Sequence, residues 1–227
     1  MGEVRILLAS NSPRRRQLIS LGGWQFDTAP ANLDESLLAG EKPADYVLRL
    51  AKAKARAAAA SAGPRQVILG SDTTVVIDGD ILGKPADDTE ATAMLRRLRG
   101  RTHQVYTGIA ALDNASGRLL SDLCVTDVPM RAYGDDEISA YVASGDPLDK
   151  AGAYAIQHPG FQPVASMAGC FASVMGLPLC HLTRLLRQFE LPPEADIPAA
   201  CQAFLHYDCP VYSSILGDER ITNQESS

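Results

Sequence analysis

With 227 residues, 46% of them hydrophobic and 21% charged, the chain can bury a sizeable core without disulfide or metal staples. A formal net charge of -6 argues against stable nucleic-acid binding, which rests on clustered cations that neutralise phosphates. No stretch approaches the roughly 18 apolar residues that span a bilayer, and Met1 to Ser10 is too short and mixed for a signal peptide. We therefore expect a cytoplasmic protein that does not bind membranes.

The first predicted elements are a strand over Val4 to Ala9 and a helix that has Ser12 as its N-cap, begins at Pro13 and stops at Gly22-Gly23. Free backbone N–H groups at a helix start favour anions. Hydroxyls and arginines surround this start, namely Ser10, Ser12, Arg14 and Arg15. The segment either binds a polyphosphate or is an ordinary capped helix with surface arginines.

An acidic loop and a second helix come next. Asp34-Glu35 offers oxygen ligands that suit magnesium, although a solvated acidic loop is the commoner arrangement. Helical spacing of apolar residues predicts a helix from about Ala44 to Ala62. Lys54 falls on its apolar face, where a lysine either snorkels along its aliphatic stem or enters a cleft.

The next predicted strand, Val67 to Gly70, delivers Asp72 and Thr73 at its carboxyl end, where α/β proteins often place ligands. A carboxylate there can hold a metal or activate water, or simply form a turn. Asp78-Gly79 lies between short apolar runs and predicts a hairpin. Lys84 follows in a loop.

The second half begins with a predicted helix from near Asp88. Gln104 to Leu112 and Leu119 to Tyr133 predict two antiparallel strands, and Asp135 caps a short helix. The last predicted helix starts near Pro178. Three basic residues lie in the loops around these elements: Arg101, His103 and Lys150. Taken alone, each is expected to be a surface or structural residue.

The cysteines and the C-terminal segment carry weaker signals. Five cysteines form an odd set without a CxxC pair, which favours reduced thiols: Cys124, Cys170, Cys180, Cys201 and Cys209. Cys201, His206 and Cys209 raise the alternative of zinc, but their spacing matches no standard pattern and a fourth ligand is missing. The final residues are polar, and we expect them to be mobile.

These elements predict an α/β or α+β fold built on an elongated mixed β-sheet with flanking helices. We expect one domain over residues 1–191 and a C-terminal extension of uncertain structure over residues 192–227.

Read together, several segments resemble the Maf family of nucleoside triphosphate pyrophosphatases over about Val4 to Phe189. They occur in the family's order: LLASNSPRRRQLISLGG, LDES, YVLRLAKAKA, ILGSDTTVVIDGDILGKP, LRGRTHQVYTG, YVASGDPLDKAGAYAIQ and VMGLPL. The resemblance implies two lobes around a cleft, a fold related to inosine triphosphate pyrophosphatases, and a homodimer. It also implies hydrolysis of a nucleoside triphosphate to the monophosphate and pyrophosphate with a divalent metal, Mg²⁺ or Mn²⁺.

The resemblance also implies a role for each motif. Ser10, Ser12, Arg14 and Arg15 would bind phosphates. Glu35 and Asp72 would bind the metal ion and activate the attacking water. Either one could be the general base, with the other mainly a metal ligand. Lys54 and Lys84 would neutralise charge.

Substrate choice is the finest inference from the resemblance. Arg14, Thr73 and Gln157 match the specificity positions of the branch that acts on dTTP and UTP. The alternatives are the 7-methyl-GTP branch, a non-catalytic nucleotide-binding regulator of cell division, and a phosphatase that releases orthophosphate. The chain departs from the family pattern at His158 to Gly160 and at Gly169 to Ala172.

Overall fold

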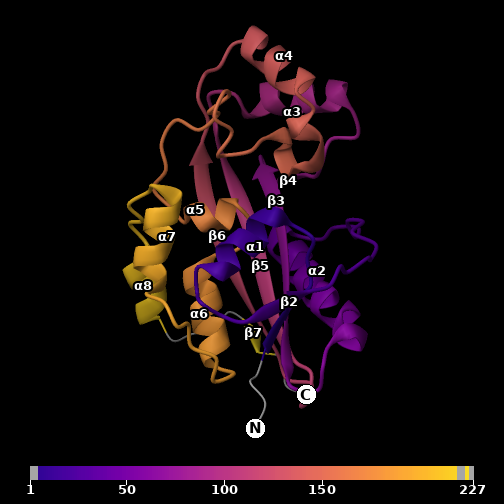
Figure 1. The fold of residues 1–227 in the computed structure, drawn as a ribbon. Coiled ribbons are helices and arrows are strands. Elements are labelled where there is room, and N and C mark those ends of the chain that lie inside the picture. The colour runs from indigo at the N-terminus through magenta and orange to yellow at the C-terminus, as the bar shows by residue number, and fades with distance from the viewer. Residues whose placement is uncertain (1–4, 219–222, 225–227) are drawn as a thin grey trace.

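The computed structural model describes residues 5–218 and 223–224, which form a seven-stranded mixed sheet with helices on both faces (Figure 1). The strand order is β2-β1-β3-β5-β6-β7, and β4 pairs with β3. The strands are β1 (Arg5–Leu8), β2 (Phe26–Thr28), β3 (Gln66–Ile77), β4 (Asp80–Leu82), β5 (Thr102–Asp113), β6 (Leu119–Pro129) and β7 (Asn223–Gln224). β1 runs parallel to β2 and β3, and the other pairs are antiparallel. The predicted mixed sheet is confirmed.

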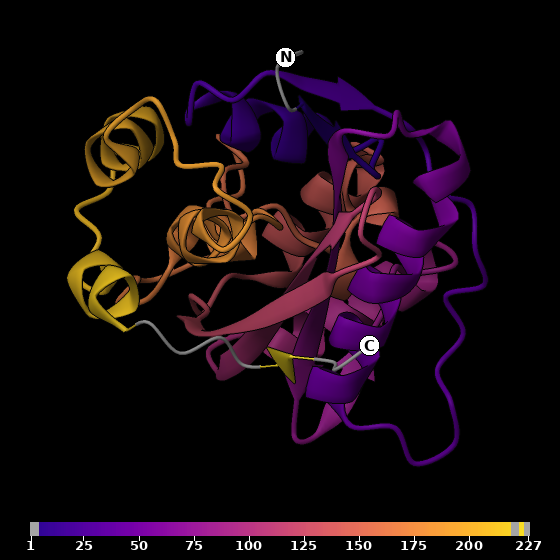
Figure 2. The same ribbon diagram turned by 90° about the horizontal axis from the view of Figure 1, so that it is seen from below.

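The helices lie in layers on the two faces of this sheet. They are α1 (Pro13–Ser20), α2 (Pro43–Ala57), α3 (Asp88–Leu98), α4 (Asp135–Ala143), α5 (Phe171–Val174), α6 (Leu179–Arg187), α7 (Ile197–Leu205) and α8 (Tyr212–Gly217). Short 3₁₀ turns cover Ala59–Ser61, Asp146–Asp149 and Ala151–Ala153. Figure 2 shows the sheet between α2 on one side and α6, α7 and α8 on the other.

Three apolar clusters lie along the sheet in the described residues. One packs Ala51 and Ala55 of α2 on the sheet, and the other two give the molecule two lobes. In one lobe, Val67 and Leu69 of β3 pack with α1, α5 and α6. In the other, Val75 and Ile77 of the same strand pack with α3 and α4, which lie together at the far end of the sheet (Figure 1). β3 therefore passes through both lobes, and its middle lies between them.

The prediction that β3 ends at Gly70 was wrong. The strand pairs with β5 without interruption from Val67 to Val76, so Asp72 lies in mid-strand. The long strand β5 pairs with the β3 backbone through this polar stretch, where the local sequence indicated the end of the strand. On the opposite edge, β1 pairs only up to Leu69 and β4 only from Val75 on. Within the described residues this edge is left without a strand partner at Asp72.

Two strand glycines let α2 rest directly on the sheet. A Cβ on Gly70 would overlap the carbonyl oxygen of Ala51, and one on Gly108 would lie 2.6 Å from that of Val47. The helix ends at Ala57, short of the predicted Ala62, and a 3₁₀ turn follows. This close approach brings Lys54 to the middle of β3.

Most other predicted elements are confirmed with small boundary shifts, but β6 ends at Pro129 and not at Tyr133. No helix within residues 5–218 is long and apolar enough to cross a membrane.

The C-terminal extension contains α7 and α8, and its Ile197 and Leu205 join the core of the α6 lobe. The boundary between domain and extension stays a prediction. The expectation of mobile final residues falls on 219–222 and 225–227, outside the described residues.

Candidate active site

A cleft of about 750 Å³ opens at the middle of β3, where the two lobes meet. The site residues that the family resemblance implies all line it: Ser10, Ser12, Arg14, Arg15, Glu35, Lys54, Asp72, Thr73, Lys84 and Gln157. Asp34, the other carboxylate of the acidic loop, is not among the lining residues and accepts from Ser36. The implied site residues come from the loop before α1 and its first turn, the loop before α2, α2 itself, β3 and two later loops. The structure thus brings together side chains that are far apart in the sequence.

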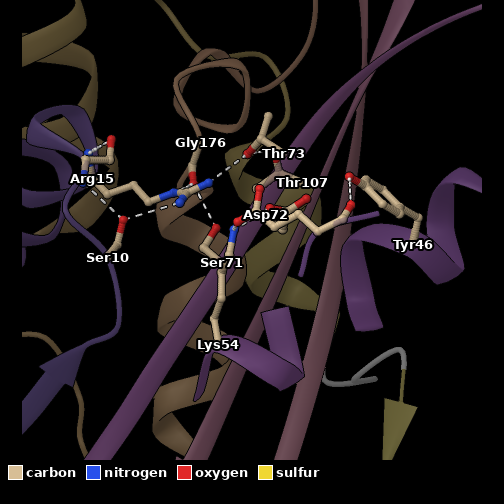
Figure 3. Close-up of polar contacts among 11 residues, drawn as sticks. Ser10, Arg15, Tyr46, Lys54, Ser71, Asp72, Thr73, Thr107 and Gly176 are labelled. Atoms are coloured by element: carbon tan, nitrogen blue, oxygen red, sulfur yellow. Dashed lines mark hydrogen bonds and ion pairs between the residues drawn. The ribbon is translucent and has the colours of Figure 1, made fainter. Parts of the chain in front are cut away.

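Lys54 joins the two predicted carboxylates. Its Nζ lies 2.7 Å from Asp72 Oδ1 (Figure 3). The same Nζ lies 2.7 Å from Glu35 Oε1, and the lysine is only 8% exposed. The alternative of a lysine that snorkels to solvent is thereby excluded. A buried ammonium of this kind needs paired carboxylates, because an unpaired buried charge is costly.

The two carboxylates differ in pKa. Burial raises the pKa of Asp72, and the opposing charges of Lys54 and Arg15 do not fully offset it. Burial also acts to raise the pKa of Glu35, but Lys54, Lys84 and Arg15 together hold it below its usual value. Two neighbouring carboxyl groups with different pKa values are typical of active sites in which one group transfers a proton and the other stays ionised.

Arg15 extends from the first turn of α1 across the cleft. Its Nε donates to the carbonyl oxygen of Gly176 at 2.9 Å, and its terminal nitrogens lie 3.3 Å from Ser10 Oγ and 3.4 Å from Thr73 Oγ1 (Figure 3). Burial lowers its pKa, yet a guanidinium stays protonated in proteins. Ser12 caps α1 by accepting from the Arg15 backbone N–H at 3.4 Å. The helix start therefore presents positive charge to the cleft, from the Arg14 and Arg15 side chains and from the positive end of the helix dipole.

A hydroxyl network ties β3 to the turn after α5. Ser71 Oγ donates to Gly176 O at 2.9 Å, the Thr73 and Thr107 hydroxyls lie 3.0 Å apart, and Thr107 Oγ1 donates to Ser173 O at 2.8 Å. Gly176 has a φ of +104°, which favours glycine, and its carbonyl accepts from both Arg15 and Ser71. This turn holds Arg15 in place from the other side of the cleft.

The remaining predicted residues lie at the rim. Lys84 and Gln157 are exposed and line the opening, and the charge of Lys84 contributes to the lowered pKa of Glu35. Arg14 is half-buried beside Arg15. The rim can thus reach a ligand whose charged part lies deeper, between α1 and β3.

Sequence reasoning missed several residues of the cleft. Tyr46 donates its hydroxyl to Glu35 O at 2.9 Å and so fastens the acidic loop to α2; burial raises its pKa to about 12. Lys150 lines the cleft while 8% exposed and donates to Asp146 O and Asp149 Oδ1, each at 2.6 Å, so its reading as a surface cation was wrong. Nothing local in the sequence marks Tyr46.

His103 and Arg101 lie apart from this chemistry. His103 is buried, its Nε2 lies 2.8 Å from the Tyr154 hydroxyl, and burial lowers its pKa to about 4. Arg101 pairs with Asp78 at 2.6 Å on the surface. The structural interpretation of both residues is confirmed.

Among the described residues, the oxygen donors of the cleft can hold a metal ion only as a pair of carboxylates. In the described part of the chain, no group of three or more His, Cys, Asp and Glu side chains converges as a metal centre, which gives the zinc alternative no support. Glu35 and Asp72, however, already direct one oxygen each at a single cation, the Lys54 ammonium. Two carboxylates of this kind fit Mg²⁺ or Mn²⁺ that takes its other ligands from substrate phosphates and water.

A mixed sheet that carries paired carboxylates and several cations in one cleft defines a protein built to bind and process a small polyanion. The family model described as Maf-like protein matches residues 5–189. The chain therefore belongs to the Maf family.

Curated relatives cover most of the chain. A dTTP/UTP pyrophosphatase of Anaeromyxobacter dehalogenans is 48% identical over 194 residues, which are 84% of this chain and 97% of the relative. A dTTP/UTP pyrophosphatase of Geobacter sulfurreducens is 46% identical over 83% of this chain and 98% of its own.

Among solved structures, a nucleoside-triphosphatase described as a dITP/XTP pyrophosphatase from Mycobacterium abscessus aligns with a TM-score of 0.41 and 15% identity. The alignment covers 82% of this chain and 95% of the other. The relation to inosine triphosphate pyrophosphatases stays a prediction.

Proposed function

We propose that this protein hydrolyses nucleoside triphosphates, above all dTTP and UTP, to the monophosphate and pyrophosphate. The observation that carries the proposal is the convergence of Glu35, Asp72, Lys54 and Arg15 in one cleft. Relatives that are 46–48% identical over most of the chain carry the name dTTP/UTP pyrophosphatase, which supports this substrate class.

In this proposal the triphosphate tail lies against the start of α1. Arg15 and Arg14 meet the phosphate oxygens, and the N–H groups and hydroxyls around Ser10 and Ser12 add hydrogen bonds. Lys84 approaches from the opposite rim. Positive charge on both sides of the tail stabilises the departing pyrophosphate, because phosphoryl-type transfer depends on positioning and electrostatics.

Asp72 is our candidate for the base. It accepts a proton from a water whose oxygen attacks the α-phosphorus, while the bond from that phosphorus to the bridging oxygen breaks and pyrophosphate leaves with the electron pair. Burial raises the pKa of Asp72, which makes it a better proton acceptor than an exposed aspartate. The lowered pKa of Glu35 suits a group that stays ionised, and Lys54 orients both carboxylates.

A divalent cation, Mg²⁺ or Mn²⁺, would be held by Glu35 and Asp72. When bound, it would supply positive charge to the phosphate oxygens and help to orient the attacking water. Treatment with a chelator is expected to abolish turnover, and added Mg²⁺ or Mn²⁺ to restore it.

Base selection would fall to Arg14, Thr73 and Gln157. Thr73 is held by Thr107 and Arg15, so it presents a fixed hydroxyl, whereas Gln157 is exposed at the rim and can reach the base. The alternative substrate, 7-methyl-GTP, has a methylated purine base, which is larger than the pyrimidine base of dTTP or UTP and would need different contacts at this rim.

The deciding experiment incubates the purified protein with Mg²⁺ and a panel containing dTTP, UTP, 7-methyl-GTP and the other canonical triphosphates. Chromatography then identifies each product. Pyrophosphate from dTTP and UTP supports the proposal. Orthophosphate would indicate a phosphatase, and tight nucleotide binding without products would indicate a regulator.

We further propose a cytoplasmic homodimer. The family resemblance supports the dimer, and the expectation from the sequence supports the location. Light scattering of the purified full chain measures the first, and fractionation of cells measures the second. A monomeric mass at micromolar concentration would contradict the dimer.

A further inference from the structure

The C-terminal extension, described over residues 192–218 and 223–224, lies outside the match to the family model, which covers residues 5–189. We propose that this extension is a positioning device that fixes Arg15 in the cleft, and that Tyr207 is the residue through which it acts. The inference rests on the proposed function, because it assigns a task to Arg15 that only a phosphate-binding cleft needs. The extension contacts both elements that hold Arg15.

The first contact is with the end of α1, the helix that carries Arg15. Within the extension, the backbone N–H of Glu194 donates to Gly22 O at 2.9 Å. Just before it, the carbonyl oxygen of Leu191 accepts from the indole N–H of Trp24 at 3.2 Å. Trp24 is buried at 8% exposure in the same core as Ile197. The start of the extension therefore anchors the C-terminal end of α1.

The second contact is with the start of α5. The Tyr207 hydroxyl donates to Gly169 O at 3.0 Å, and the Tyr207 ring lies 5.5 Å from the ring of Phe171, centroid to centroid. Phe171 is the first residue of α5, and α7 packs on this short helix. The extension thus supports α5 at the end away from the cleft.

A continuous series of contacts leads from Tyr207 to Arg15. Within α5 and its turn, the N–H of Met175 donates to Phe171 O at 3.2 Å and that of Gly176 to Ser173 O at 2.9 Å. Gly176 O then accepts from Arg15 Nε at 2.9 Å. The turn after α5 therefore supplies the shortest of the three side-chain hydrogen bonds that place the guanidinium, the other two being to Ser10 and Thr73.

α5 cannot hold this turn by itself. It has four residues, Phe171–Val174, and isolated helices of this length are unstable because nucleation is costly. Thr107 supports the cleft end through Ser173 O at 2.8 Å, and Tyr207 supports the other end. Loss of Tyr207 leaves one end of α5 without that support, and the Arg15 acceptor gains freedom.

The test measures phosphate binding without turnover, with inorganic tripolyphosphate as the probe and calorimetry on the full chain. Tyr207→Ala is expected to raise the dissociation constant for tripolyphosphate roughly tenfold, because a small displacement of a phosphate-binding arginine weakens binding strongly. Tyr207→Phe keeps the ring and loses only the hydroxyl, so it should fall between wild type and Tyr207→Ala. Phe204→Ala, which removes a ring that is 38% exposed on α7, is the matched control and should stay within about twofold.

A double-mutant cycle separates positioning from general loosening of the fold. If Tyr207 acts through Arg15, Tyr207→Ala should raise the dissociation constant for tripolyphosphate less than about twofold when Arg15→Lys is already present. Equal losses in both backgrounds, or unchanged binding by both Tyr207 variants, would overturn the proposal. Failure of the proposed function looks different: the wild type would bind tripolyphosphate, and the variants would follow the pattern above, while dTTP gave no pyrophosphate.

Discussion

Glu35 and Asp72 share one counter-ion, because Lys54 Nζ lies 2.7 Å from an oxygen of each. The Asp72 side chain is 8% exposed, whereas the Glu35 side chain is 46% exposed. The same lysine thus links a buried carboxylate to one at the cleft opening. The difference in burial explains why their pKa values move in opposite directions.

Asp72→Asn should nearly silence turnover and preserve the fold. Loss of a general base slows reactions by about a hundredfold to ten-thousandfold, and asparagine has nearly the same shape. The initial rate of pyrophosphate release from dTTP measures the effect, with circular dichroism as the check on folding. Asp88→Asn, at an exposed carboxylate in the first turn of α3 that does not line the cleft, is the control and should change the rate far less. Near-normal release by Asp72→Asn would refute the assignment of the base.

Lys54→Met should destabilise the protein by about 3 kcal/mol at pH 7, since removal of one partner leaves a buried carboxylate without its counter-ion. The folded-state pKa of Asp72 is already raised, and the substitution raises it further. A carboxyl group with a raised pKa stabilises the fold below its unfolded pKa, and this contribution is lost as pH rises through the folded value. Urea unfolding should therefore show a smaller penalty near pH 4 than at pH 7. A penalty that does not vary with pH would contradict the role of Asp72 ionisation.

Glu35→Gln should shift the acidic limb of the pH profile to lower pH. The negative charge of Glu35 is one cause of the raised pKa of Asp72, so its removal eases ionisation of the base. The measurement is kcat/KM against pH on the residual activity, since this ratio reports the free enzyme. A limb that stays in place or moves upward would show that Asp72 does not control it.

Gly70→Ala should destabilise the fold by about 1–3 kcal/mol, because a Cβ there would overlap the Ala51 carbonyl of α2 and force the helix away from the sheet. Turnover should fall as well, since Lys54 moves with α2. Gly63→Ala is the matched control, because its Cβ would meet nothing nearer than 3.8 Å. Equal stability of the two variants in urea would contradict the close contact of helix and sheet.

The sequence predicted the parts of the site that have a local signature. The cap at Ser12, the apolar face that includes Lys54 and the hairpin at Asp78-Gly79 each follow from a short pattern, and each lies as expected. The mid-strand position of Asp72 was missed because β5, a partner distant in sequence, extends the strand. Tyr46 and the Gly176 carbonyl act through long-range contacts that no spacing encodes.

The extension shows the same limit. Its composition predicts neither helix packing nor a hydrogen bond from Tyr207 to Gly169, which lies 38 positions away in sequence. Such contacts depend on where α6 places the chain, and this is a property of the packed core.

Hydrolysis of dTTP in water enriched in ¹⁸O tests the central claim most directly, because the label reports which phosphorus the water attacks. We predict unlabelled pyrophosphate and one ¹⁸O atom in the thymidine monophosphate, as attack at the α-phosphorus requires. Label in pyrophosphate or orthophosphate, or no product at all from the wild-type protein with Mg²⁺, would contradict the account.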